Sequence, residues 1–480
     1  MMSQEKLKHK TKVGLYWSFL NLFANNGLQF VVGIFMARML SPEDYGITAL
    51  PGVFLAIAGT LMDAGFSSAL VRKPELTEKD LSTSFFYSLF VGAFCYLAIF
   101  LAAPWIANFY GIPILGPLVR VTALMFLWGP LGTPQSVLLQ RKLDFKTPAR
   151  ISIITKIVGS VVGLFFAYLG YGLWALVIMG VVSSFLSTIL TWLAVKWLPK
   201  AGWSKESFSY LWNFGNKIIV TYIIDQLYQN ITPIVIGKYY TPAQLGQYNR
   251  AEGYANLPSR QVTGMLQNVT FPVLSKLQED KGKMAEKYRL MIKTLSFVIM
   301  PVMMGLAALA NPLVLVLIGE KWAPCIIFLQ VMCFTRCLYP ILSLNVNLLM
   351  VTGCSDLYLK LEVTKKILGV IMLIVTLPIS VMALVWGNLV YSIVLLVVNT
   401  FYTSKLISVS LVTQLKDIIP SWLLSFVMFL CVWGYTQLVE NYYLQIFGGI
   451  IIGGIVYISG SYLFKFKEMN EVLYMLNRKR

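Results

Sequence analysis

The sequence predicts an all-α polytopic membrane protein with about 14 transmembrane helices. Two observations predict it: the composition and the length of the apolar runs. Hydrophobic residues make up 57% of the 480 residues and charged residues 12%, whereas a soluble domain carries roughly a quarter charged residues. Apolar runs of about 20 residues, enough to cross a hydrocarbon core of about 30 Å, recur from Val13 to Phe464. Because these runs lack the alternation of membrane strands, every span is expected to be a helix.

Short polar interruptions separate the predicted spans and leave no room for a soluble domain. The first span follows a basic segment but is too long for a cleaved signal peptide, so it is expected to stay as the first helix. The spans cover residues 14–38, 45–70, 82–104, 115–139, 149–168, 172–196, 209–237, 243–272, 289–311, 324–351, 357–378, 380–403, 418–438 and 443–464.

The charges of the loops predict the topology. Lys and Arg gather in the N-terminal tail, in every second loop and at the C-terminal end, whereas the loops around Ala107, Tyr171 and Pro378 contain none. Because positive residues are retained on the cytoplasmic side, both termini are expected there, in a bacterial inner membrane. The net charge of +18 thus belongs to loops beside anionic headgroups, and no nucleic-acid partner is expected.

The reactive groups argue against an enzyme. The single histidine, His9, lies in the N-terminal tail, which leaves no histidine-based triad. No glycine loop with lysine is present to hold a nucleotide phosphate, and the predicted outer loops are too short and too weakly charged for a glycosyltransferase or polymerase site. The six cysteines are scattered, and Cys333 and Cys337 have no second pair or histidine beside them. No catalytic residue, metal site or cofactor is predicted.

An internal repeat is visible at an offset of two hundred residues. The turn from Ala37 to Gly46 contains a cation, a Ser that can cap a helix, a Pro suited to the first helical turn and a Gly. The turn from Gly237 to Gly246 places the same features in register. Two further pairs of sites match in the same order: Asn25 and Gln29 with Asp225 and Gln229, and Pro104 to Gly111 with Pro312 to Gly319. The repeat indicates a duplication.

The duplicated unit contains six spans, so both copies insert with the same orientation and are expected to be related by an axis along the membrane normal. The sequence therefore predicts an N-terminal lobe over residues 1–205, a C-terminal lobe over residues 206–408, and two additional helices with a cytoplasmic tail over residues 409–480. In the additional pair, Gly448, Gly449, Gly453 and Gly454 allow close approach of a helix or a lipid tail.

Three motifs carry a resemblance to a known family: the Ala37 to Gly46 turn, the Asp63 to Phe66 segment followed by Arg72, and the Pro104 to Gly111 turn. The chain resembles the polysaccharide-transport branch of the multidrug/oligosaccharidyl-lipid/polysaccharide (MOP) exporter superfamily, which includes the Wzx-type flippases. The resemblance covers essentially the whole chain in length and loop pattern. It implies a transporter that alternates between inward-open and outward-open states, with a cationic cavity that accepts an undecaprenyl-diphosphate-linked oligosaccharide.

The residues themselves place polar and charged groups at membrane depth, where they usually face a cavity or a partner. The first predicted helix carries Asn25 and Gln29 on one polar stripe, the seventh carries Lys217, Asp225 and Gln229, and the eighth carries a third stripe. Residues expected to bind substrate are Arg260, Arg336, Arg250, Arg120, Lys217, Asn25, Gln29, Gln229 and Asn256. Residues expected to act in gating or ion coupling are Asp63, Asp225, Glu252 and Arg38.

Structural roles stay open for several of these residues. Arg38, Arg120 and Arg250 can reach the outer interface along their aliphatic stems, and Asp63 can pack against cations at the inner end of its helix. The Asn and Gln stripes can hold helices together, as polar residues do in many bundles. Arg260 and Arg336 lie nearest mid-membrane and are the strongest candidates for a cavity lining.

The expected function is translocation of an undecaprenyl-diphosphate-linked oligosaccharide, a repeat unit of O-antigen, capsule or exopolysaccharide, to the outer leaflet. The surplus of cations at membrane depth favours an anionic cargo, because diphosphate forms charge-assisted hydrogen bonds with Arg and Lys. A lipid II flippase and a cation-coupled multidrug exporter are the alternatives, and a non-transport scaffold also stays open. We also expect coupling to a proton or sodium gradient and function as a monomer. The expected partners are membrane lipids and the polysaccharide polymerase and assembly proteins.

Overall fold

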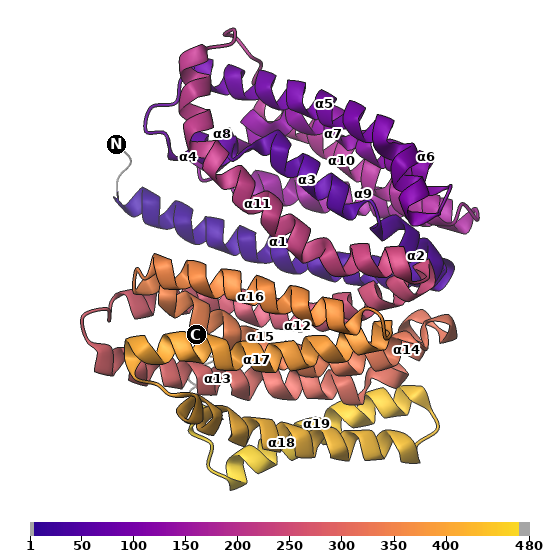
Figure 1. Cartoon of the computed structure of the whole chain (residues 1–480), viewed down its shortest axis with the longest axis vertical. Helices are drawn as coiled ribbons and strands as arrows, with labels where there is room; N and C mark the ends of the chain where they lie inside the picture. Colours follow the sequence, from indigo (N-terminus) through magenta and orange to yellow (C-terminus); the bar gives the residue numbers. More distant parts are fainter. Residues whose placement is uncertain (1–3, 470–480) are drawn as a thin grey trace. The chain divides into compact units, whose positions relative to one another are not determined.

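The protein is helical throughout the part that the structure describes (Figure 1). The computed structural model describes the backbone of residues 4–469, and the side chains of these residues except 4–16, 18, 19, 217, 218, 265, 266, 268 and 269. No β-strand occurs within residues 4–469, which confirms the predicted all-α class. The chain divides into two compact units, residues 1–246 and residues 247–480.

The first unit is built from helices of very different length. It contains α1 (Gln4–Met39), α2 (Pro42–Ala49), α3 (Gly52–Asp63), α4 (Phe66–Arg72), α5 (Glu78–Tyr110), α6 (Leu115–Ala123), α7 (Met125–Trp128), the 3-10 turn η1 (Gly129–Gly132), α8 (Thr133–Arg141), α9 (Lys146–Tyr168), α10 (Leu173–Val195) and α11 (Lys205–Tyr239), and the start of α12 (Pro242–Ser275). Within it α9 packs against both α1 and α10, and α11 packs against α3, α4 and α5.

The second unit continues α12 and adds the remaining helices. They are α13 (Lys281–Ala308), α14 (Ala310–Ile318), the 3-10 turn η2 (Glu320–Trp322), α15 (Cys325–Val351), α16 (Ser355–Thr376), α17 (Val381–Ile407), α18 (Leu411–Leu438) and α19 (Tyr442–Leu463). Helix α15 packs against α13 and α17, α18 packs against α13, and α19 pairs with α18. The lobe boundaries predicted at 205 and 408 stay a prediction, because spatial compactness and sequence duplication are separate criteria.

Eleven helical segments among the described residues are long and apolar enough to cross a membrane, so the chain is a multi-pass membrane protein. The other three predicted spans fall on α11, α12 and α16, which are long helices outside that set of eleven. Helices α11 and α12 carry the predicted polar stripes, which lower their hydropathy. The count of 14 and the cytoplasmic termini stay predictions.

The second predicted span, residues 45–70, is broken into α2, α3 and α4. Ala64 and Gly65 both adopt left-handed backbone conformations, with φ of 46° and 69°, and this turn separates α3 from α4. Arg141 at the end of α8 donates hydrogen bonds to the carbonyls of Leu70 at 2.8 Å and Pro74 at 2.9 Å. It thereby satisfies carbonyls at the C-terminal end of α4 that helix geometry leaves without a partner.

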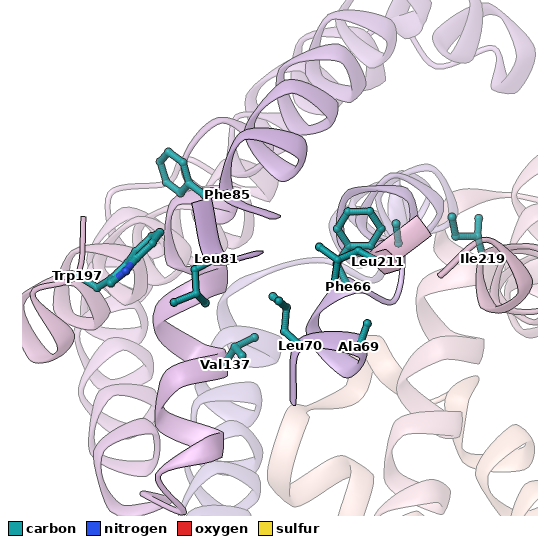
Figure 2. Close-up of a cluster of buried hydrophobic side chains, with 10 residues drawn as sticks. Phe66, Ala69, Leu70, Leu81, Phe85, Val137, Trp197, Leu211 and Ile219 are labelled. Carbon is teal, nitrogen blue, oxygen red and sulfur yellow. The ribbon is translucent and has the colours of Figure 1, made fainter. Parts of the chain in front are cut away.

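A hydrophobic cluster surrounds this break (Figure 2). Phe66 and Leu70 of α4 are fully buried beside Leu211 of α11, and Figure 2 shows Val137 and Leu81 on the neighbouring helices. A Cβ added to Gly215 of α11 would lie 2.0 Å from the carbonyl oxygen of Ala64, so α11 approaches the break backbone to backbone. The cluster fixes α11 against the second span.

The two duplicated turns have the same local structure. Ser41 accepts a hydrogen bond from the Asp44 backbone N–H at 3.1 Å, and the Asp44 side chain accepts one from the Ser41 N–H at 2.9 Å. Thr241 and Gln244 repeat this reciprocal capping box at 3.3 Å and 3.2 Å. The predicted cap, and the Pro in the first turn of α2, are confirmed.

These two turns also touch each other within the first unit, and their contact is reciprocal. A Cβ added to Gly46 would lie 1.8 Å from the carbonyl oxygen of Pro242, and a Cβ added to Gly246 would lie 1.9 Å from the carbonyl oxygen of Pro42. Real side chains essentially never approach so closely. Glycine is therefore required at both positions of the repeat for the turns to meet.

The substitution Gly46→Ala is expected to destabilise the protein by about 1–3 kcal/mol, because the added methyl group forces the two turns apart. Thermal unfolding of the purified protein in detergent measures the effect. Gly27→Ala is the matched control, because a Cβ there meets nothing within 4 Å and alanine favours the helix. Equal melting temperatures for the two variants would contradict a tight turn contact.

The two additional helices are tied to the second unit through a polar and ionic contact. The carboxylate of Asp417 in α18 is 3% exposed and accepts hydrogen bonds from Arg289 of α13 at 2.7 Å and 2.9 Å, and Lys293 lies 3.4 Å away. The polar groups of Gln414, Asn345 and Tyr288 are connected beside it, with the Tyr288 hydroxyl donating to the Asn345 oxygen at 2.6 Å. Helix α18 is thereby anchored to α13 and α15.

The glycines of α19 serve helix packing. Cβ atoms added to Gly448, Gly449 and Gly453 would lie 2.2 Å, 2.7 Å and 3.3 Å from side-chain atoms of α18 or of the α13–α14 junction. The sequence allows either a helix or a lipid tail to approach these glycines. At these three positions a neighbouring helix or helix junction lies against them. A Cβ at Gly454 would meet nothing within 4 Å.

Asp417→Asn is expected to lower the free energy of unfolding by about 1.5–3 kcal/mol, because the amide lacks the charge that pairs with Arg289 and Lys293 and keeps only one of the two acceptor oxygens. The melting temperature of the detergent-purified protein is the measurement. Asp280→Asn is the matched control: Asp280 also pairs with a cation of α13, but its side chain is 46% exposed, and little change is expected. A larger loss for the control would contradict the anchoring role of Asp417.

Candidate functional site

An ion pair joins α12 to α15 in the second unit. Arg336 Nη2 donates to Glu252 Oε1 at 2.9 Å, and the two side chains are 26% and 30% exposed. The Arg336 guanidinium also lies 5.7 Å from the centre of the Tyr339 ring, and the Arg336 carbonyl accepts a hydrogen bond from Ser259 of α12 at 3.2 Å. Two residues predicted for different roles, substrate binding and ion coupling, are thus brought together.

The pair lies deep along both helices. Glu252 is ten residues into α12 and Arg336 is eleven residues into α15, about 15 Å and 16 Å along each axis at 1.5 Å per residue. The predicted spans 243–272 and 324–351 place the start of both helices at the membrane surface, so these distances are expected to correspond to about half of a hydrocarbon core of about 30 Å. A partly exposed charge pair is too costly against lipid at this depth, so its exposed side is expected to face water.

Two other predicted cations, Arg120 of α6 and Arg250 of α12, are packed against aromatic rings. Arg120 donates from Nε to the Phe100 carbonyl at 3.2 Å and lies 4.5 Å from the centre of its ring. The Arg250 guanidinium lies 5.6 Å from the ring centre of Tyr254 and 5.5 Å from that of Trp322, which is fully buried. Rings attract cations through their negative faces, so both arginines contribute to helix packing.

The polar stripe of α1 splits into two environments. Asn25 is 8% exposed, donates to Asn21 and accepts a hydrogen bond from Ser152 of α9 at 3.2 Å. Gln29, one turn further along α1, is exposed. Asn25 therefore holds α1 to α9, which is the structural role that the sequence left open, and Gln29 is accessible.

The remaining predicted residues are placed as follows. Asp63, at the end of α3, accepts a hydrogen bond from Ser67 at 2.5 Å. The Lys217 side chain lies outside the described part of the chain. Arg260, Gln229 and Arg38 are exposed, and Asn256 and Asp225 are half-buried.

Sequence reasoning missed two groups. Asp417 with Arg289 and Lys293 was not predicted, although an acid near a basic helix end is a visible signal for such a pair. The buried polar network around Asn345 was also missed, because its members come from four helices and no local spacing connects them. It comprises Tyr288, Asn345, Thr400, Thr403 and Gln414.

The sequence and the fold of this chain are both similar to those of known proteins. Residues 35–327 match the sequence model of a family described as polysaccharide biosynthesis protein. The chain belongs to this family. The match covers more than half of the chain and includes both duplicated turns.

Several curated proteins are similar to this chain over most of their length. The teichuronic acid biosynthesis protein TuaB of Bacillus subtilis is 24% identical over 441 residues, which cover 90% of each chain. The lipopolysaccharide biosynthesis protein WzxC of Escherichia coli is 26% identical over 373 residues, 75% of this chain and 74% of its own. The succinoglycan biosynthesis transport protein ExoT of Rhizobium meliloti is 27% identical over 307 residues, 64% of this chain and 62% of its own.

Solved structures show the same fold. The inward closed conformation of the lipid II flippase MurJ superposes with a TM-score of 0.74, at 16% identity, over 94% of this chain and 98% of MurJ. An inward-facing multidrug resistance MATE family transporter of the MOP superfamily gives a TM-score of 0.60, at 15% identity, over 82% of this chain and 98% of its own. This family member therefore has a MOP-type transporter fold, as the sequence motifs predicted.

The substitutions Asn25→Ala and Gln29→Ala test whether Asn25 holds α1 to α9 and whether Gln29 is free of such a packing role. Asn25→Ala is expected to lower the free energy of unfolding by about 0.5–1.5 kcal/mol, because its hydrogen bond to Ser152 is lost, whereas Gln29→Ala leaves it unchanged. Melting temperatures in detergent provide the comparison. A destabilised Gln29→Ala protein beside an unaffected Asn25→Ala protein would reverse the assignment.

Proposed function

We propose that this protein is a flippase for an undecaprenyl-diphosphate-linked oligosaccharide, which it moves from the cytoplasmic to the outer leaflet of a bacterial inner membrane by alternating access. The cargo is a repeat unit of a surface polysaccharide, such as O-antigen, capsule or exopolysaccharide. The observation that carries the proposal is the combination of the polysaccharide biosynthesis family with a transporter fold over 94% of the chain.

The names of the relatives support this cargo class. TuaB, WzxC and ExoT are named for the biosynthesis of teichuronic acid, lipopolysaccharide and succinoglycan, and ExoT is named as a transport protein. Relatives named for three different polymers are all similar to this chain, which favours a common step on a lipid-linked precursor. The glycan itself is expected to be bound loosely, because the polymers in these names differ so much.

The charges of the candidate site support an anionic cargo. Arg336 presents a planar set of donors at membrane depth, and Arg260 is an exposed cation two turns after Glu252 on α12. Arginine binds phosphoryl groups through paired, charge-assisted hydrogen bonds. A diphosphate can accept such bonds on both of its phosphoryl groups.

Coupling to a proton or sodium gradient is part of the proposal. Asp225 and Asp63 are carboxylates on α11 and α3 that can bind such a cation, and Arg38 lies at the end of α1. Glu252 on α12 is paired with Arg336, and we assign it to gating. A carboxylate that binds and releases a cation as the cavity opens to each side would drive the cycle. We propose no other cofactor.

The membrane context follows from the loop charges. We propose cytoplasmic termini, contacts with membrane lipids, function as a monomer, and contact with the polymerase and assembly proteins that use the translocated unit. The alternative with a specific observation behind it is a lipid II flippase, since the MurJ fold covers 94% of the chain. A multidrug exporter shares the fold but not the family name.

Deletion of the gene in its host is expected to abolish one surface glycan while growth continues, because the glycan precursor stays in the inner leaflet. Glycan staining of whole cells is the measurement. Loss of viability would favour lipid II as cargo, and unchanged glycan with lost drug resistance would contradict the proposal.

Complementation with Arg336→Ala is expected to restore about ten- to hundredfold less glycan, because a charged contact of about 1.5–3 kcal/mol is removed. Lys365→Ala is the matched control, because it breaks the Lys365–Glu362 pair of α16, which has similar length and exposure. Full glycan export by Arg336→Ala would contradict a role for this arginine in transport.

A further inference from the structure

A flippase for a lipid-linked phosphate works among anionic phospholipids that carry the same chemical group. An unpaired arginine at membrane depth would bind a phosphodiester headgroup by the charge-assisted hydrogen bonds that bind a diphosphate. Phospholipids are far more abundant than any polyprenyl-linked sugar. Selectivity therefore needs a feature that distinguishes one phosphoryl group from two.

The Arg336–Glu252 pair is more exposed than the pairs formed by Asp417 and Asp80, the other described carboxylates that pair with a cation of a different element. The Lys365–Glu362 pair is similarly exposed but lies within one helix, α16. The carboxylate of Asp417 is 3% exposed and that of Asp80, which pairs with Lys73, is 0% exposed. The side chain of Glu252 is 30% exposed and that of Arg336 is 26% exposed. The pairs of Asp417 and Asp80 are closed to an incoming anion, whereas Arg336 can be reached by one.

From this contrast we infer that Glu252 is a specificity filter: its carboxylate occupies Arg336 in the empty protein and excludes anions that carry a single phosphoryl group. The inference rests on the proposed function. When a headgroup with one phosphodiester binds Arg336, its phosphate replaces the Glu252 carboxylate. Glu252 then lacks its cationic partner, which is costly at this depth. The exchange brings no compensating contact, so it is unfavourable.

A diphosphate brings a second phosphoryl group that can compensate. Arg260 lies eight residues after Glu252 on α12, about 12 Å along the axis, and its side chain is exposed. Ser259, the neighbour of Arg260, is hydrogen-bonded to the Arg336 carbonyl, which places this part of α12 against α15. Two long arginine side chains can converge on a diphosphate from these positions, so Arg336 and Arg260 together displace the carboxylate.

The test measures lipid translocation in proteoliposomes with fluorescent phosphatidylglycerol, whose accessible fraction is quenched by dithionite. The wild-type protein is expected to leave phosphatidylglycerol in place, and Glu252→Gln is expected to translocate it at least about tenfold faster. Fluorescent phosphatidylcholine should stay in place in both, because its headgroup is neutral overall. Glu362→Gln is the matched control, since it uncovers Lys365 of a similar pair elsewhere in the second unit.

Two further variants keep the test decisive. Glu252→Gln combined with Arg336→Gln removes the uncovered cation, so phosphatidylglycerol translocation should return to the wild-type level. Glu252→Asp retains a shorter carboxylate and should give an intermediate rate, which replaces the first measurement if Glu252→Gln does not fold. Melting temperatures establish which variants are folded.

The outcomes separate the filter from the proposed function. Translocation of a polyprenyl-diphosphate oligosaccharide by the wild-type protein is measured in the same vesicles, and its absence would overturn the proposed function. If that transport is present, two results would overturn the filter alone: a folded Glu252→Gln or Glu252→Asp protein that still excludes phosphatidylglycerol, or a wild-type protein that already translocates it. Selective gain of phosphatidylglycerol transport in Glu252→Gln, reversed in the double variant, supports the filter.

Discussion

A hydrocarbon core offers no hydrogen bonds, so each polar group that this chain places in the membrane needs a partner or access to water. The described part of the structure meets this constraint in graded ways. Asp417 is covered and held by Arg289, Asn25 is hydrogen-bonded to a neighbouring helix, and Arg336 is paired but still accessible. The exposed fraction of each polar side chain distinguishes groups that hold helices together from groups that can exchange partners.

The two repeated turns impose a second constraint on the first unit. The turns at Ser41 and Thr241 carry the same capping box, and their glycines accept the backbone of the opposite turn. Because the contact is reciprocal, a single duplicated motif supplies both sides of it.

The long apolar runs predicted the helices well because membrane thickness sets their length. Every predicted span falls on helical residues, although the spans 45–70, 115–139 and 289–311 are each divided among more than one helix. Helices α11, α12 and α16 lie outside the set that is apolar enough to cross by composition. For α11 and α12 the polar stripes explain this, because polar residues lower the mean hydropathy of a helix. The break at Ala64 escaped prediction because a left-handed alanine has no reliable sequence signal.

Local spacing could place Glu252 and Arg336 at membrane depth but could not pair them, because 84 residues separate them in the chain. Local spacing likewise put Asn25 and Gln29 on one stripe. Only the tertiary structure shows that Asn25 is buried against Ser152 of α9 whereas Gln29 is exposed. The sequence by itself determined the helical class, the repeat and the family resemblance, since these depend on hydropathy and local motifs. The tertiary structure decided which charges are neutralised and which can be reached, because both properties arise from contacts between distant helices.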